Sequence, residues 1–136
     1  MKIAIRYFSK TGNTEKLANG IAVATGVTAH TIDKPLDDDV DILFLGSSVM
    51  ATKPRKEIRK FIKNIDVNVG QVVNFGTAAI TTSTYPEVKK FIEKKGLIMS
   101  NQEFHCKGSF TGMHKGRPNA DDVAEVSKFA QEIINH

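Results

Sequence analysis

Short apolar runs and amphipathic runs alternate along the whole chain, and this alternation constrains the fold more than any other feature of the sequence. Short runs rich in aliphatic residues are typical of mostly buried parallel strands. Five such runs are present, namely KIAIRYF, VTAHTI, DILFLGS, QVVNFGT and EFHCKG. Strands that alternate with helices predict a parallel sheet with helices on both faces. We therefore expect an α/β fold with a doubly wound, five-stranded parallel sheet in a single domain over residues 1–136, although Arg6 does not suit a buried strand.

Four amphipathic segments predict the helices. The first begins near Thr14 and ends near Gly26, and the second repeats apolar residues at i, i+3, i+4 and i+7 from Ile58. Thr84-Tyr85-Pro86-Glu87 has the pattern of a capping box with proline in the first turn, which predicts the start of the third helix. Asn119 followed by Asp122 predicts the start of the last helix in the same way.

The composition is that of a cytoplasmic protein without a membrane segment. No stretch approaches the roughly 18 apolar residues that span a bilayer, and Arg6 and Lys10 interrupt the first apolar run too early for a signal peptide. The one cysteine, Cys106, fits a reducing compartment, and we expect it to be a buried, inert thiol. The four histidines show no metal-ligand spacing, so we expect no metal site.

The stretch FSKTGNTEKL, residues 8–17, follows the first strand run and has the composition of a phosphate-binding loop. Ligands of parallel sheets bind beyond the carboxyl ends of the strands. Ser9, Thr11 and Thr14 offer hydroxyl donors, and Gly12 permits a tight turn. The helix that follows points its positive dipole end at the same place, which suits a phosphate dianion. The alternative is a helix start capped by Ser or Thr, which needs one such residue instead of three.

The absence of two other motifs narrows the class of phosphate ligand. Neither GxxxxGK followed by Ser or Thr, which binds nucleoside triphosphates, nor the dinucleotide motif GxGxxG is present. A terminal monophosphate is the group that remains.

Ser9-Lys10-Thr11-Gly12-Asn13-Thr14 resembles the phosphate loop of the flavodoxin family, which holds the phosphate of FMN, and the order of elements resembles that of a short-chain flavodoxin. The resemblance implies the sheet order 2-1-3-4-5, with the flavin over the carboxyl ends of the first, third and fourth strands. It implies no catalytic residue. It implies that the FMN-binding residues are Ser9, Lys10, Thr11, Gly12, Asn13, Thr14, Ser47, Ser48, Val49, Met50, Ala51, Gly76, Thr77, Ala78, Ala79 and Tyr85.

The flavin loops depart from the family pattern at several positions. Ala51 stands where the family has a glycine, and Thr52 stands where some short flavodoxins have an acidic residue. The chain has no Trp, so the aromatic residue available to stack on the flavin is Tyr85, which could equally have a structural role in its helix start. Met50 can fill part of the gap with its thioether. We expect the flavin to be held less tightly than where an aromatic ring stacks on it.

The net charge of +4 comes from the middle of the chain. Residues 53–95 carry ten cations and four anions, whereas residues 1–52 and 96–136 each carry a net charge of −1. These cations are either solvated helix faces or a docking surface for a redox partner with an acidic surface. The cluster expected to meet such a partner is Lys53, Arg55, Lys56, Arg59, Lys60 and Lys63, with Lys89, Lys90, Lys94 and Lys95 beside it. We do not expect nucleic acid as a partner, because no aromatic residues are interleaved with the cations.

Three functions follow from these features. The first is an FMN-binding protein that carries electrons between redox enzymes, with a less negative potential for full reduction than an acidic flavodoxin has. The second is a small FMN-dependent reductase of quinones or similar acceptors that uses NAD(P)H directly. The third is a flavodoxin-like binding module in which flavin binding is weak or lost.

Overall fold

Five parallel strands form one sheet in the computed structural model, which describes residues 1–9, 12–49, 56–78, 83–107 and 116–135. The strands lie in the order β2-β1-β3-β4-β5, as predicted, and each neighbouring pair is parallel. Their bounds are Ile3–Tyr7 for β1, Ala29–Thr31 for β2, Val40–Val49 for β3, Val69–Ala78 for β4 and Phe104–Lys107 for β5.

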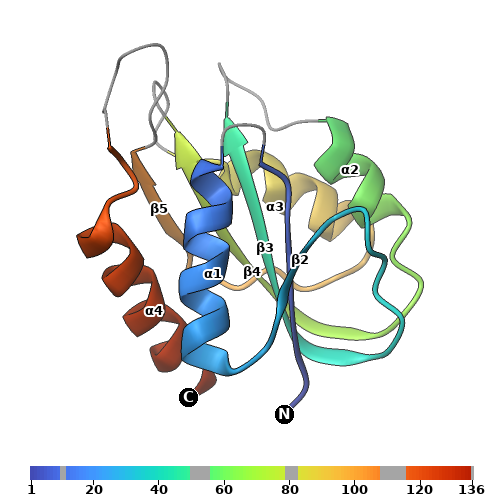
Figure 1. The fold of residues 1–136 in the computed structure, drawn as a ribbon. Coiled ribbons are helices and arrows are strands. Elements are labelled where there is room, and N and C mark those ends of the chain that lie inside the picture. The colour runs from blue at the N-terminus through green and yellow to red at the C-terminus, as the bar shows by residue number, and fades with distance from the viewer. Residues whose placement is uncertain (10–11, 50–55, 79–82, 108–115, 136) are drawn as a thin grey trace.

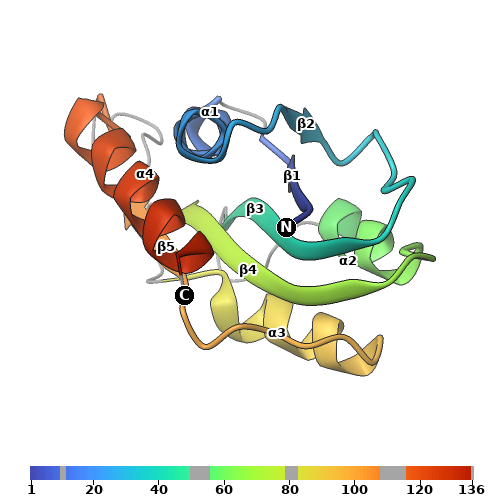
Figure 2. The ribbon, with the colours of Figure 1, turned by 90° about the horizontal axis from the view of Figure 1, so that it is seen from below.

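Helices cover both faces of this sheet (Figures 1 and 2). The helices α1, Asn13–Thr25, and α4, Ala120–Ile134, lie on one face, and α2, Lys56–Lys63, and α3, Tyr85–Lys94, lie on the other. Each face has its own apolar core, because successive strand residues point to opposite sides: Phe44 packs under α1 and α4, whereas Leu45 packs under α2 and α3. In the described part of the chain, no helix has the length and apolar character needed to cross a membrane.

The helix ends show which local patterns determine the structure. Gly26 ends α1 with φ 75°, and its N–H donates to the carbonyl of Ala22, as expected for a glycine at a helix end. Asn119 and Asp122 form the predicted capping box at the start of α4. The capping box predicted for Thr84 is wrong, because its side chain makes no cap hydrogen bond. The Thr84 hydroxyl instead accepts a hydrogen bond of 2.9 Å from the amide of Asn74 on β4.

Arg6 is buried in β1, and the structure explains how a strand residue of this kind is accommodated. Its Nε donates to the carbonyl of Lys34 at 2.8 Å, and its two Nη atoms donate to the carbonyls of Ile5 and Pro35. The segment between β2 and β3 therefore lies over the guanidinium group. Burial lowers the pKa of Arg6, and the nearby Asp37 carboxylate partly offsets this effect.

The strand register places three carboxyl ends side by side. Tyr7 at the end of β1 pairs with Gly46 on β3, and Ser47 and Ser48 pair with Gly76 and Thr77 on β4. The chain winds in opposite directions on the two sides of β1, so this end of β1 and β3 is the switch point at which open parallel sheets bind ligands.

Candidate cofactor site

The turn between β1 and α1 is closed by its own side chain and backbone. Ser9 Oγ accepts a hydrogen bond of 2.9 Å from the N–H of Gly12, which has φ 86° and is the N-cap of α1. An N-cap glycine has no side chain, so α1 does not begin with the Ser or Thr cap that the alternative interpretation of this loop requires. The positive φ favours glycine at this position. The start of α1 therefore presents backbone N–H groups and a dipole that suit an anion.

Tyr7 ties the first turn of α1 to the end of β1. Its hydroxyl donates to Glu15 Oε2 at 2.8 Å. Burial and the Glu15 carboxylate raise the pKa of Tyr7 to about 12, so the hydroxyl stays protonated and keeps donating at neutral pH. This contact holds the helix start at a fixed place beyond the strand.

Thr14 brings α1 against the end of β4. Its hydroxyl lies 3.3 Å from that of Thr77, and both residues are buried. The predicted phosphate loop and the predicted loop after β4 therefore meet, although 63 residues separate the two threonines.

Ser47 supplies a buried hydroxyl at the same edge of the sheet. The residue is 1% exposed, and its Oγ has no hydrogen-bond partner among the described residues. Buried hydroxyl groups in native proteins usually bind a protein group, a water molecule or a ligand. Its strand neighbour Gly76 approaches it closely, because a Cβ built at Gly76 would lie 2.5 Å from the carbonyl oxygen of Ser47.

The remaining predicted cofactor residues fall into three groups. Asn13 is buried at the start of α1, and Ser48 is half-buried at the end of β3. Val49 and Ala78 end β3 and β4 and pair with each other. Outside the described residues lie Lys10, Thr11, Met50, Ala51 and Ala79.

Tyr85 takes part in packing at the start of α3. Its hydroxyl donates to the carbonyl of Ser100 at 2.8 Å, its ring packs against the core under α2 and α3, and Lys89 Nζ lies 5.9 Å from the ring centroid. The structural role considered for this residue accounts for the ring in this position. Its stacking on a flavin stays a prediction.

Neither a reactive cysteine nor a metal cluster is found in the described part of the chain. Cys106 on β5 is half-buried, and burial together with the Asp122 carboxylate raises the pKa of its thiol to about 12, so the nucleophilic thiolate is scarce at neutral pH. Within the described segments, no group of three or more His, Cys, Asp or Glu residues could hold a metal ion.

A polar network at the start of α3 corresponds to none of the motifs predicted from the sequence. Asn74, inside the apolar run QVVNFGT, is completely buried and contacts Thr84, and Ser83 Oγ donates to Glu103 Oε1 at 3.2 Å. The available signal was an amide residue in the middle of a strand that is otherwise apolar. Polar residues are rare at fully buried positions unless they are hydrogen-bonded.

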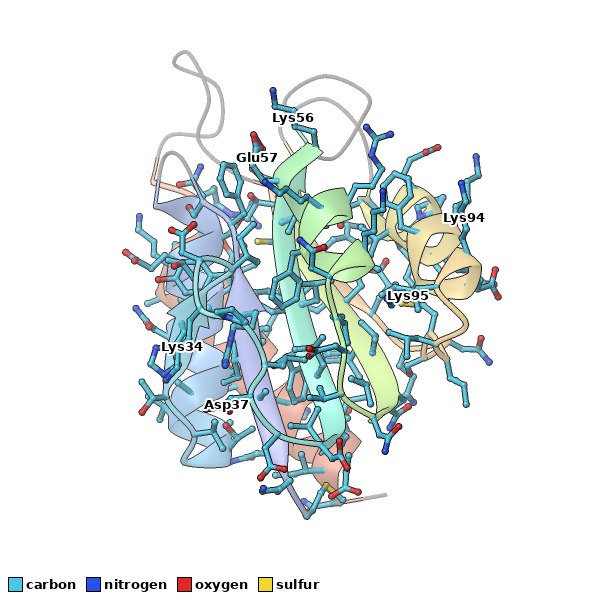
Figure 3. The ribbon with its side chains drawn as sticks, turned by 90° about the vertical axis from the view of Figure 1, so that its right-hand side faces the viewer. Lys34, Asp37, Lys56, Glu57, Lys94 and Lys95 are labelled. Carbon is cyan, nitrogen blue, oxygen red and sulfur yellow. The ribbon has the colours of Figure 1, made fainter. Side chains whose placement is uncertain are left out.

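A basic surface covers the outside of α2 and α3 (Figure 3). Between residues 56 and 95 the chain carries eight cations and four anions. Arg59 lies 5.7 Å from the ring centroid of Phe91, and Lys95 Nζ donates to the carbonyl of Lys63, so the two helices share this surface. Lys56 lies at the same end of the molecule as the carboxyl ends of the strands. Of the predicted cluster, Lys53 and Arg55 lie outside the described residues.

Comparisons with known proteins agree with this architecture. A family model described as a flavodoxin domain matches residues 4–112. An archaeal flavodoxin structure is 16% identical with a TM-score of 0.72, and the alignment covers 100% of both chains. Flavodoxin 2 from Bacillus cereus is 22% identical over 99% of both chains, with a TM-score of 0.72. A short-chain flavodoxin associated with a bacterial microcompartment is 17% identical over 99% of this chain and 98% of that one, with a TM-score of 0.71. No curated protein sequence matches significantly.

Proposed function

Because the chain belongs to the flavodoxin family, we propose that it binds FMN at the switch point of the sheet and carries electrons between redox proteins. The observation that carries the proposal is the convergence of three separate strand ends on one edge. There, the glycine-capped start of α1 and the Thr14–Thr77 pair lie beside the hydroxyl of Ser47, which has no hydrogen-bond partner among the described residues. These groups fit a phosphate and a polar ring system, since they are hydrogen-bond donors held in place by buried backbone.

Each part of the site has its own task in this proposal. The turn closed by Ser9 and Gly12 aims the first N–H groups of α1 at the phosphate. The ends of β3 and β4 line the ring on one side and limit its contact with water. FMN, when bound, supplies the one- and two-electron chemistry, and the protein determines its orientation and electrostatic surroundings.

The partner in this proposal is a redox protein whose docking surface is acidic. The cations of α2 and α3 are mostly exposed, and their surface begins at Lys56, near the strand ends where the flavin would lie. Opposite charges steer two proteins into encounter and lose this effect as salt rises. The same cations would favour the reduced flavin anion, so the potential for full reduction should be less negative than that of an acidic flavodoxin.

An electron carrier is favoured over a reductase with its own substrate. The archaeal flavodoxin and the Bacillus cereus protein match this chain over essentially their whole length, so it has no large insertion relative to them that would build a substrate pocket. The reductase alternative predicts direct, saturable oxidation of NAD(P)H by the FMN-loaded protein.

The experiment that tests FMN binding compares two ligands that differ in the phosphate alone. The apoprotein is titrated with FMN and with riboflavin, and the visible absorption and flavin fluorescence are followed. We expect near-stoichiometric FMN binding, with riboflavin bound at least about tenfold more weakly, because riboflavin makes no contact with the α1 turn. Equal affinities would contradict the phosphate site, and no binding at micromolar FMN would overturn the electron-carrier function and leave the binding-module alternative.

A further inference from the structure

A buried polar pair lies inside the apolar core that α2 and α3 cover. Asn74 on β4 is 0% exposed, and Thr84 at the start of α3 is 1% exposed. The Asn74 amide nitrogen donates to Thr84 Oγ1 at 2.9 Å. The surrounding strand residues are apolar, because Val72 packs in the same core and Val73 and Phe75 pack on the other face.

One atom of the pair lacks a hydrogen bond in the described part of the chain, which lowers the free energy of unfolding. Asn74 Oδ1 has no hydrogen-bond partner in the described part of the chain. A buried carbonyl without a partner is destabilising, and replacement of both residues of such a pair by apolar residues of the same shape can be nearly neutral or stabilising. The stability of the sheet therefore gives no reason for an amide at position 74.

The pair fixes the start of α3 against β4. Thr84 lies directly over Gly76, where a Cβ would come within 3.0 Å of its hydroxyl. On either side of Thr84, Ser83 donates to Glu103, and the Tyr85 hydroxyl donates to the carbonyl of Ser100. Three consecutive residues are thus held by two segments, β4 and the stretch between α3 and β5, directly beside Gly76 of the candidate cofactor site.

We propose that Asn74 is a positioning residue of the cofactor site, which acts through Thr84 to hold the start of α3 against Gly76 at the end of β4, where the flavin would bind. This inference rests on the proposed FMN binding. The carbonyl oxygen of Asn74, which has no partner in the described part of the chain, lowers the stability of the apoprotein. The hydrogen bond from its amide nitrogen holds Thr84 in a defined position beside the site. Removal of the pair should therefore change the properties of the flavin without weakening the fold to the same degree.

The test is a double-mutant cycle with Asn74→Leu, Thr84→Val and both changes together, in the full-length chain. Urea unfolding of each apoprotein, the FMN dissociation constant and the reduction potential of bound FMN are measured at one temperature. We expect the double variant, which removes both partners, to leave apoprotein stability about equal to that of wild type, and Asn74→Leu to weaken FMN binding about fivefold and to shift the reduction potential. The double variant should bind FMN no more weakly than the weaker single variant, because all three lose the same hydrogen bond.

Two controls separate positioning from a general loss of hydroxyl groups. Thr84→Ser keeps the hydroxyl and should restore both affinity and potential. Thr25→Val removes a hydroxyl that donates to the carbonyl of Ile21 near the C-terminal end of α1, and it should leave the flavin unchanged. If Asn74→Leu fails to fold, the comparison of Thr84→Val with Thr84→Ser takes its place. The FMN dissociation constant and the reduction potential are measured for both variants.

The outcomes distinguish this inference from the function on which it rests. If the wild-type protein binds FMN and the variants show its affinity and potential unchanged, Asn74 has no positioning role and the proposed function stands. If the wild-type protein binds no FMN, both proposals are overturned.

Discussion

Gly76 shows at the scale of one residue how closely the cofactor edge of the sheet is packed. A Cβ at this position would lie 2.5 Å from the carbonyl oxygen of Ser47, closer than real Cβ atoms approach backbone. Gly70, near the other end of the same strand, has an equivalent contact of 2.5 Å with the carbonyl oxygen of Asp41. The two glycines therefore form a matched pair: at either position, near opposite ends of β4, a Cβ would clash with a carbonyl oxygen of β3.

We predict that Gly76→Ala and Gly70→Ala destabilise the apoprotein to a similar extent, by about 1–3 kcal/mol, since backbone must move to admit each methyl group. Gly76→Ala alone should weaken FMN binding, because the end of β3 that it displaces contributes to the proposed site. Urea unfolding and FMN titration of both variants check this. Equal FMN affinities in the two variants would place the flavin away from the ends of β3 and β4.

At the scale of single elements, local sequence patterns predicted most of the fold. The periodicity of apolar residues located the strands and the helices, and Asn119 with Asp122 marked the start of α4 because both partners of that capping box lie within four residues. The order of the strands came from the family resemblance and was confirmed.

The failures occurred where a distant segment competes with a local pattern. Thr84 has the sequence of a helix cap, but its hydroxyl bonds to Asn74, ten residues away on a buried strand. Arg6 is accommodated by carbonyl groups of Lys34 and Pro35, which follow it by 28 and 29 residues. The Thr14–Thr77 contact in the site is equally non-local. Spacing along the chain cannot reveal such contacts, because they depend on how the strands stand side by side.

The start of α4 provides a prediction for pH. Arg117 donates two hydrogen bonds of 2.7 Å to the Asp122 carboxylate, and these bonds, with help from the backbone of Asn119, hold the pKa of Asp122 below its ordinary value of 3.8. The unfolded chain therefore binds this proton more readily. The resulting stabilisation is fully present above about pH 4 and is lost as the pH falls through the lowered pKa.

We predict that Asp122→Asn destabilises the protein at pH 7 and that its difference from wild type shrinks as the pH falls through the lowered pKa, because the wild-type carboxyl group then also becomes neutral. Urea unfolding midpoints at a series of pH values between 2 and 7 measure this difference. Asp121→Asn, at the exposed neighbouring position in the same helical turn, is the control for the loss of one negative charge. A difference that stays constant over the whole range would mean that the hydrogen-bonded pair does not govern the acid response.

At the scale of the whole molecule, charge is segregated between two regions. The cations of α2 and α3 lie on one side, and the segment between β2 and β3 carries four exposed aspartates within residues 33–39 (Figure 3). Net charge alone would act equally on every encounter, whereas a segregated field directs an anionic partner to one side of the molecule. The two effects can be separated by variants that have the same net charge and differ in where it changes.

We predict that Lys56→Glu with Lys60→Glu slows oxidation of the reduced, FMN-loaded protein by ferricyanide, an anion, several-fold at low salt and accelerates oxidation by hexaammineruthenium, a cation. The matched control is Lys34→Glu with Lys128→Glu, which makes the same change in net charge at exposed positions away from the α2–α3 surface. Stopped-flow absorbance at several salt concentrations gives both rates, and the difference between the two double variants should vanish at high salt because counterions screen exposed charges. If the two double variants change the rates equally, the protein acts through its total charge, and the surface of α2 and α3 gives no direction to electron transfer.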